Sequence, residues 1–337
     1  MARITFGLAT SHGPMLSIPW EYWFDRVDAD KSNPKHFFKG QTYRFDEMVE
    51  LQRAERLAEQ IAPAVCAERH TRCQNAIRDL ADFFEQHRPD AAVVVGNDQM
   101  EVFTSDHVPT FAVFWGDYVE GHPRTPEFLA KLNRGIARAE ADRTPPVYTR
   151  YPCLPDLGRH VIQHMIRDSF DVAQIKKLSV GEIGVNSAPH AYGFVYRRLM
   201  RDKVVPHVPV FVNTFYPPNQ PAAGRCFEFG RAMARAIAAW PQDWKVAVIA
   251  SGGLTHFVVD ESFDRCVLDA LQNGDAAKLA GLPESMFQSG TSEIKNWIAV
   301  AGAMSESGLR MQLVDYVPCY RSEAGTGSAM GFAKWVA

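Results

Sequence analysis

Four groups of polar residues stand where they could do chemistry in this 337-residue sequence. His12, residues 97–99 (Asn-Asp-Gln) and His256 each come soon after an apolar run, and Glu293 opens a stretch with helical spacing. Taken singly, a histidine can merely cap a strand end, and an acidic residue is commonplace in the first turn of a helix. The four groups therefore carry meaning only as a set.

As a set they point to a metal centre. Two neutral imidazoles and one carboxylate, with coordination positions left open, form the arrangement used by non-haem Fe(II) oxygenases. Any further histidines can serve as general acid and base. In open α/β sheets ligands bind at the carboxyl ends of the strands, so His12 can point into such a crevice.

The elements that must hold these residues alternate along the chain. The apolar runs predict strands from Ile4 and over 91–96, 109–115, 180–185, 208–212, 245–250 and 309–316. Helical periodicity predicts helices over 45–62, 63–86, 126–141, 158–168, 224–240, 264–273 and 292–304. We expect residues 17–43, which have no clear period, to form a loop insertion near the first strand end. This alternation predicts one α/β domain over 1–337, with a central, mostly parallel or mixed sheet flanked by helices.

Composition argues against some classes of partner and indicates the compartment. The formal net charge of −3 gives no reason to expect nucleic acid or an anionic membrane as partner. No apolar run is long enough to span a bilayer, and no signal peptide is recognisable, so we expect a cytoplasmic protein. The six cysteines are scattered without a CxxC pair, which favours free thiols over a zinc cluster or a disulfide framework.

Short motifs spread along nearly the whole chain resemble a known family. They are Thr10-Ser11-His12-Gly13-Pro14, Phe38-Lys39-Gly40, Val95-Gly96-Asn97-Asp98, Pro189-His190, Tyr216-Pro217-Pro218, Ser251-Gly252-Gly253-Leu254-Thr255-His256 and Gly290-Thr291-Ser292-Glu293. In this order and spacing the chain resembles the class III extradiol ring-cleavage dioxygenases, a group that includes protocatechuate 4,5-, gallate and 3-O-methylgallate dioxygenases.

The resemblance implies roles for particular residues. It makes His12 and Glu293 ligands of Fe(II) and His256 the catalytic acid and base. It also makes His190 a second catalytic histidine, in contact with substrate or oxygen. Thr326 falls near the place where the family holds the substituent of the substrate ring.

One position departs from the family pattern. The family's second histidine ligand follows Asn-Asp, and Gln99 stands there in this chain. A glutamine carbonyl is a harder and weaker donor to Fe(II) than an imidazole. Three outcomes are open: Gln99 binds the metal, a neighbour such as Asp98 or His107 replaces it, or this branch binds metal poorly.

The resemblance implies an enzyme that opens the ring of a carboxylated catechol or gallate-type diol with O₂. Thr326 or Arg321 would then be candidates for holding the carboxylate. Alternatives are a Zn-dependent hydrolase on the same residues and a non-catalytic binding relative of the fold. The expected partners are the aromatic diol, O₂, further copies of the chain in a homo-oligomer and, in two-subunit forms of the family, a small partner subunit.

Overall fold

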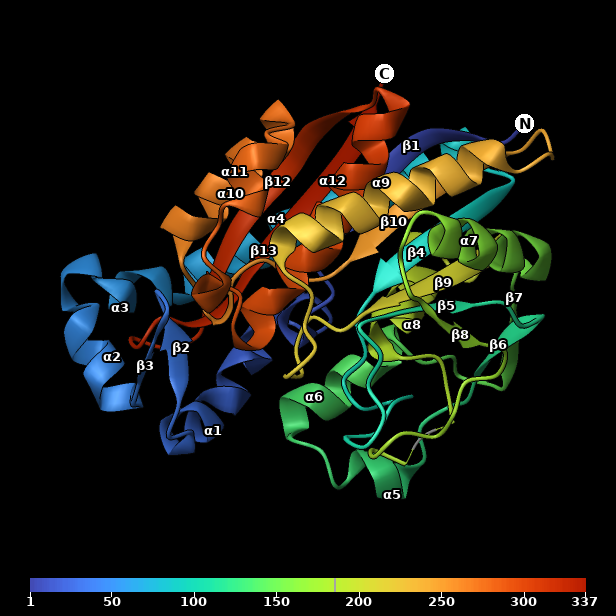
Figure 1. Cartoon of the computed structure of the whole chain (residues 1–337). Helices are drawn as coiled ribbons and strands as arrows, with labels where there is room; N and C mark the ends of the chain where they lie inside the picture. The colour runs from blue at the N-terminus through green and yellow to red at the C-terminus, as the bar shows by residue number, and fades with distance from the viewer. Residues whose placement is uncertain (185) are drawn as a thin grey trace.

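A nine-stranded mixed sheet runs through the part of the chain that the structure, a computed structural model, describes, namely residues 1–184 and 186–337 (Figure 1). Its order is β11-β13-β1-β10-β4-β9-β5-β8, and β12 pairs with β13. The strands are β1 (Arg3–Thr10), β4 (Ala91–Gly96), β5 (Phe111–Phe114), β8 (Ala173–Ile175), β9 (His207–Val212), β10 (Lys245–Ser251), β11 (His256–Val258), β12 (Arg310–Tyr320) and β13 (Thr326–Val336). Two small hairpins join β2 (His36–Phe38) to β3 (Gln41–Tyr43) and β6 (Tyr118–Gly121) to β7 (Thr149–Pro152).

The four central strands are parallel and end together. β1 pairs with β10, β10 with β4, and β4 with β9, all in parallel, whereas β13 and β5 flank this group in antiparallel pairs. The register places Thr10 opposite Ser251, so the loops after β1 and β10 leave the sheet at the same edge. The predicted α/β class with a mostly parallel or mixed sheet is confirmed, and this edge is where the predicted site residues gather.

Helices cover both faces of the sheet (Figure 1). The helices are α1 (Val27–Ser32), α2 (Phe45–Leu51), α3 (Leu57–Gln60), α4 (Pro63–His87), α5 (Pro126–Leu129), α6 (Arg134–Ala139), α7 (Pro155–Arg167), α8 (His190–Phe194), α9 (Ala223–Ala239), α10 (Glu261–Asn273), α11 (Ala276–Ala280) and α12 (Ile294–Ser307). Along β4, Val93 and Val95 belong to the core under α9 and α12, and Ala92 and Val94 to the core under α4. A strand buried on both faces must be apolar throughout, which explains the run at 91–96.

α9 and α12 lie in close contact. A Cβ atom added to Gly230 of α9 would lie 1.7 Å from the carbonyl oxygen of Ala299 in α12. Only glycine permits this approach of the two backbones. The contact fixes α12, and therefore Glu293 just before it, against the sheet.

Several predicted elements need correction. Residues 17–43 are not a loop: they form the 3₁₀ helix Trp20–Arg26, α1 and the β2–β3 hairpin, elements too short to show a period. The helix predicted over 45–62 is broken into α2 and α3, with Arg56 between them in the left-handed region at a φ of 51°. No strand covers 180–184, and the last residue of the strand predicted over 180–185 lies outside the described residues.

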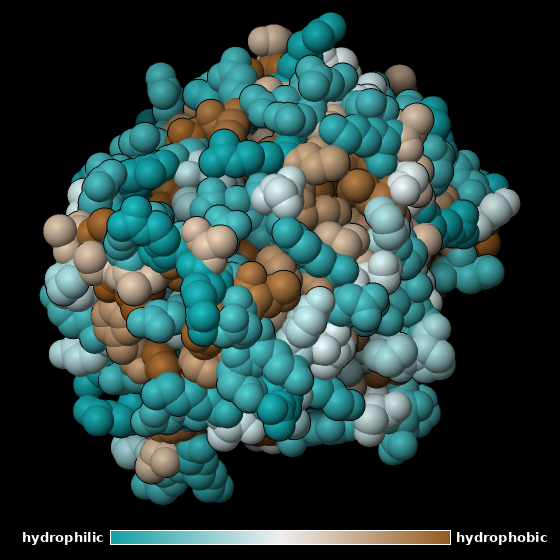
Figure 2. All heavy atoms as spheres, turned by 90° about the vertical axis from the view of Figure 1, so that its left-hand side faces the viewer, coloured by the Kyte–Doolittle hydropathy of each residue, from teal (hydrophilic) through white to brown (hydrophobic). Residues whose placement is uncertain are grey.

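The outer surface is largely polar. Figure 2 shows the face on the left of Figure 1, where hydrophilic side chains cover most of the area and hydrophobic ones lie in small patches between them. Among the described residues, no helix combines the length and the apolar character needed to cross a membrane.

Candidate metal centre

The predicted site residues meet at the carboxyl edge of the parallel strands. His12 follows β1, Asn97 follows β4, and Gly253 follows β10. Glu293 closes the 3₁₀ turn Ser289–Glu293 and directly precedes α12. These segments are distant in sequence, and the parallel register brings them to one place.

His12 presents an unpaired nitrogen to the centre of the site. The hydroxyl of Ser251 donates to the carbonyl oxygen of Ala191 at 2.7 Å, so it must accept at 2.9 Å from Nδ1 of His12. This fixes the neutral tautomer with a free lone pair on Nε2, and burial lowers the pKa of His12, which keeps it neutral. Nε2 is buried, has no hydrogen-bond partner among the described residues and lies 3.2 Å from Oε2 of Glu293.

Glu293 is held through both of its oxygens. Oε1 accepts from the Asn97 side-chain amide at 3.1 Å, and Oε2 accepts from the backbone N–H of Gly253 at 2.8 Å. Burial alone would raise the pKa of Glu293, but the neighbouring His12 and His256 hold it well below the usual range. A buried anion thus faces the lone pair of His12, an arrangement that a cation between them would stabilise.

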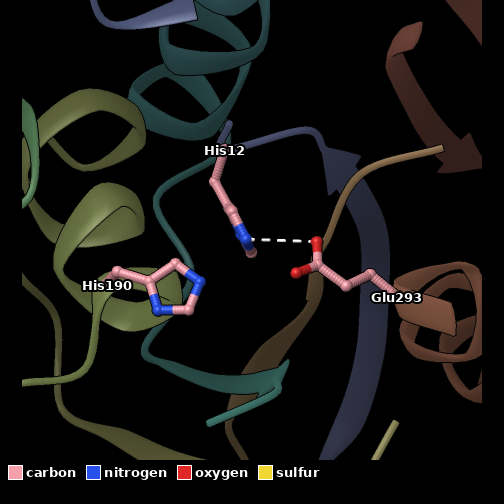
Figure 3. Close-up of side chains that lie close together, drawn as sticks. All are labelled: His12, His190 and Glu293. Carbon is pink, nitrogen blue, oxygen red and sulfur yellow. Dashed lines mark ion pairs between the residues drawn. The ribbon is translucent and has the colours of Figure 1, made fainter. Parts of the chain in front are cut away.

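His190 completes a cluster of three side chains (Figure 3). Ligand atoms of His12, His190 and Glu293 all lie within 4.8 Å of one another, and the three side chains point toward a common centre. Nδ1 of His190 lies 2.6 Å from Oε2 of Glu101, which leaves Nε2 for the centre. Burial opposes the charged form of His190, yet the carboxylate of Glu101 raises its pKa.

The donors fit a metal ion. Metal-bound histidines commonly donate their second ring N–H to a carboxylate or another acceptor, as His190 does to Glu101 and His12 to Ser251. Two imidazoles and a carboxylate suit Fe(II), and they also suit other divalent first-row metals such as Zn²⁺. The orphaned Nε2 of His12 is the most direct sign that these residues hold an ion.

His256 lies at the rim of this cluster. It begins β11 rather than closing β10, and its Nε2 lies 3.7 Å from Oε2 of Glu293. Its Nδ1 lies 2.7 Å from the carbonyl oxygen of Leu254 and donates to it, so Nε2 is the atom free to take a proton. Burial disfavours its charged form, but Glu293 raises the pKa of His256.

Two of the residues weighed for the missing ligand, Gln99 and Asp98, accept hydrogen bonds from other groups, and the third, His107, is exposed. The carbonyl oxygen of Gln99 accepts a hydrogen bond from Tyr216 at 3.1 Å. Asp98 accepts three backbone N–H groups, from residues 101, 102 and 103, and His107 is exposed. In the part of the chain that the structure describes, neither Asp98 nor His107 belongs to the three-residue cluster.

Thr326 and Arg321 form a separate buried network. The Thr326 hydroxyl donates to Asp30 at 2.7 Å, and Arg321 binds both oxygens of Asp30 at 2.6 and 2.8 Å. The polar groups of both side chains are thus hydrogen-bonded to Asp30 in α1. The role of Thr326 in substrate binding stays a prediction.

Glu101 is a residue of the site that no sequence pattern predicts. It stands only two residues after Gln99, but a lone acidic residue after a strand has no pattern that marks it. Its partner, His190, lies 89 positions further along the chain. Glu101 and His190 come into contact only because the chain folds.

Comparisons with known proteins agree with this geometry. Residues 59–327 match the family described as the catalytic LigB subunit of aromatic ring-opening dioxygenase. The chain is also 30% identical over 177 residues to the gallate dioxygenase of Pseudomonas putida, a match that covers 48% of this chain. It spans about half the length of that relative, 49%. Because the family match covers most of its length, this chain belongs to the LigB family of catalytic subunits of aromatic ring-opening dioxygenases.

Proposed function

We propose that this protein is an Fe(II)-dependent extradiol dioxygenase that opens the ring of a carboxylated catechol or gallate-type diol. The observation that carries the proposal is the cluster of His12, His190 and Glu293, with its unpaired Nε2, in a chain of the LigB family. The named relative acts on gallate, which supports an aromatic diol with a carboxylate as substrate class. The substrate would be 3-O-methylgallate, gallate or protocatechuate.

His12, His190 and Glu293 would hold the metal, which departs from the ligand set that the resemblance implied. There the second histidine position corresponds to Gln99, whose side-chain oxygen is bonded to Tyr216. His190 lies close to His12 and Glu293, and the carboxylate of Glu101 accepts a hydrogen bond from its ring. Bound Fe(II) would supply electron transfer between the diol ring and O₂.

The remaining residues would handle protons and orientation. His256 has Nε2 free, so this nitrogen would accept the proton of a substrate hydroxyl and return it later. Asn97 and the Gly253 N–H would keep Glu293 fixed while the diol binds. The buried surroundings of His12 and Glu293 would exclude bulk water from the reacting diol.

The proposal is tested on protein purified without oxygen. We expect about one Fe(II) per chain, O₂ uptake with carboxylated diols and a new near-ultraviolet or visible absorbance from the ring-opened product. His12→Ala and Glu293→Ala should lose both iron and uptake, and the exposed His107→Ala should keep them. Protein that binds Zn²⁺ and hydrolyses esters or amides would support the hydrolase alternative, and protein that binds diols without consuming O₂ would support the binding alternative.

The assembly is a separate proposal. A homo-oligomer and a small partner subunit stay predictions for this chain, and light scattering of the purified protein, with and without cell extract, tests both.

A further inference from the structure

Arg143 is a buried guanidinium with unused donors. Its Nε and Nη2 are buried and have no hydrogen-bond partner in the part of the chain that the structure describes, and its side chain is 9% exposed. Its nearest carboxylate is Glu140, 3.6 Å from Nη1, but Oε2 of Glu140 already accepts from Arg124 at 2.6 Å. One carboxylate therefore serves two guanidinium groups, and a positive charge is left over.

Arg143 packs against the helix that carries His190. The carbonyl oxygen of Arg143 packs against Gly193, one turn after His190 in α8, where an added Cβ would lie 2.0 Å from it. The backbone of Arg143 thus borders α8, the helix that begins with the proposed ligand His190.

Arg26 is a second guanidinium close to the proposed site, beside the neighbour of His256. It closes the 3₁₀ helix Trp20–Arg26, and its Cζ lies 5.5 Å from the ring of Phe257, the neighbour of His256. Among the described residues it makes no ion pair, since both oxygens of the nearby Asp30 are bonded to Arg321. Burial, followed by the charges of Arg321 and Arg143, lowers the pKa of Arg26 to about 10.

We infer that Arg143 and Arg26 together form the binding site for the carboxylate of the ring substrate. The inference rests on the proposed function, because it places the diol at the cluster of His12, His190 and Glu293. A guanidinium presents a planar fork of N–H donors that matches a carboxylate, and Arg143 has two such donors unused. A bound carboxylate would satisfy these donors and relieve the repulsion between two cations. Arg321 and Thr326, the candidates from the sequence, are already bonded to Asp30.

The test compares ligands that differ only in the carboxylate. Calorimetry on protein loaded with redox-inert Zn²⁺ measures binding of 3,4-dihydroxybenzoate and of catechol to wild type, Arg143→Gln and Arg26→Gln. The matched control is Arg138→Gln in α6, whose guanidinium is paired with Asp25 at 2.9 Å. We expect wild type to bind the carboxylated ligand more tightly, and each of the two variants to weaken that ligand alone about ten- to hundredfold.

The outcomes separate this inference from the proposed function. If catechol and 3,4-dihydroxybenzoate bind equally to wild type, or if the preference survives in both variants, the inference is overturned even when the Fe(II) enzyme consumes O₂. If the Fe(II) protein consumes no O₂ but the preference is present and lost in the variants, the carboxylate site stands and the dioxygenase proposal fails. Because Arg143 is buried, Arg143→Gln could misfold, and its unfolding curve would reveal this. In that case the ligand preference of Arg26→Gln alone tests the inference.

Discussion

Glu101 accepts two hydrogen bonds from one residue, His190: its Oε1 accepts from the backbone N–H at 2.7 Å and its Oε2 from ring Nδ1 at 2.6 Å. This double contact fixes both the position of α8, which begins at His190, and the orientation of the imidazole. It also directs Nε2 to the centre shared with His12 and Glu293. A loop residue after β4 thereby orients a proposed metal ligand on α8.

Glu101→Gln should weaken metal binding without abolishing it. The amide of glutamine replaces one acceptor oxygen by a donor, so it cannot accept from both nitrogens of His190. Loss of such a supporting hydrogen bond typically costs about 10- to 100-fold in metal affinity. Competition titration with a chromophoric chelator measures the effect, and the exposed Glu228→Gln is the control. An affinity equal to that of wild type would show that Glu101 does not orient a ligand.

Replacing Gln99 and His190 separately should identify the third ligand. We expect His190→Ala to lose at least tenfold in metal affinity, because it removes a donor. Gln99→Ala should change the affinity less than threefold, since its carbonyl oxygen is bonded to Tyr216. Anaerobic Co²⁺ titration, followed by its visible absorption bands, measures both variants. The opposite order would restore the ligand set that the family resemblance implies.

Sequence patterns predicted the parts of the fold that repeat over many residues. α4 and α9 carry long helical periods, and β4 is an apolar run buried on both faces, so the structure confirms all three within a few residues. β13 was missed, although it pairs with β1, β11 and β12 and joins both ends of the chain in one sheet. Its small residues and glycines do not alternate in polarity as an exposed strand would.

The candidate site also has a part that the sequence predicts and a part that it does not. The motifs around His12 and Glu293 located residues that the fold does bring together, because each stands beside an element whose end is visible in the sequence. The contacts that orient them, Glu101 with His190 and Ser251 with His12, join distant segments. Such pairs depend on strand order and register, which no local pattern specifies.

The Asp30 network should contribute mainly to stability. Asp30→Asn leaves the buried guanidinium of Arg321 without its anion, and breaking a buried ion pair in this way costs about 3–5 kcal/mol of unfolding free energy. Thr326→Val removes one neutral donor to Asp30 and should cost about 1 kcal/mol. Urea unfolding measures both, with the exposed Asp28→Asn on the same helix as control. If Thr326→Val instead raises KM at unchanged stability, the substrate-binding role predicted from the sequence holds.

His207 should make the protein sensitive to acid. It is fully buried at the start of β9, its Nε2 accepts from the Tyr196 hydroxyl at 2.6 Å, and burial lowers the pKa of His207 from 6.5 to about 4. Between pH 6.5 and 4, His207 is therefore protonated in the unfolded chain but not in the folded chain. Stability is intact above pH 6.5 and falls by about 3 kcal/mol as the pH drops to 4.

His207→Gln removes this titration and keeps a side chain that can accept from Tyr196. Its unfolding free energy at pH 7 will differ from wild type because of changed packing, so the quantity to compare is the change between pH 7 and pH 4. We expect that change to be about 3 kcal/mol smaller in the variant, measured by urea unfolding at four pH values. Equal changes in the two proteins would mean that His207 takes up its proton in the folded state near pH 6.5, which requires water or a relaxed backbone at the start of β9.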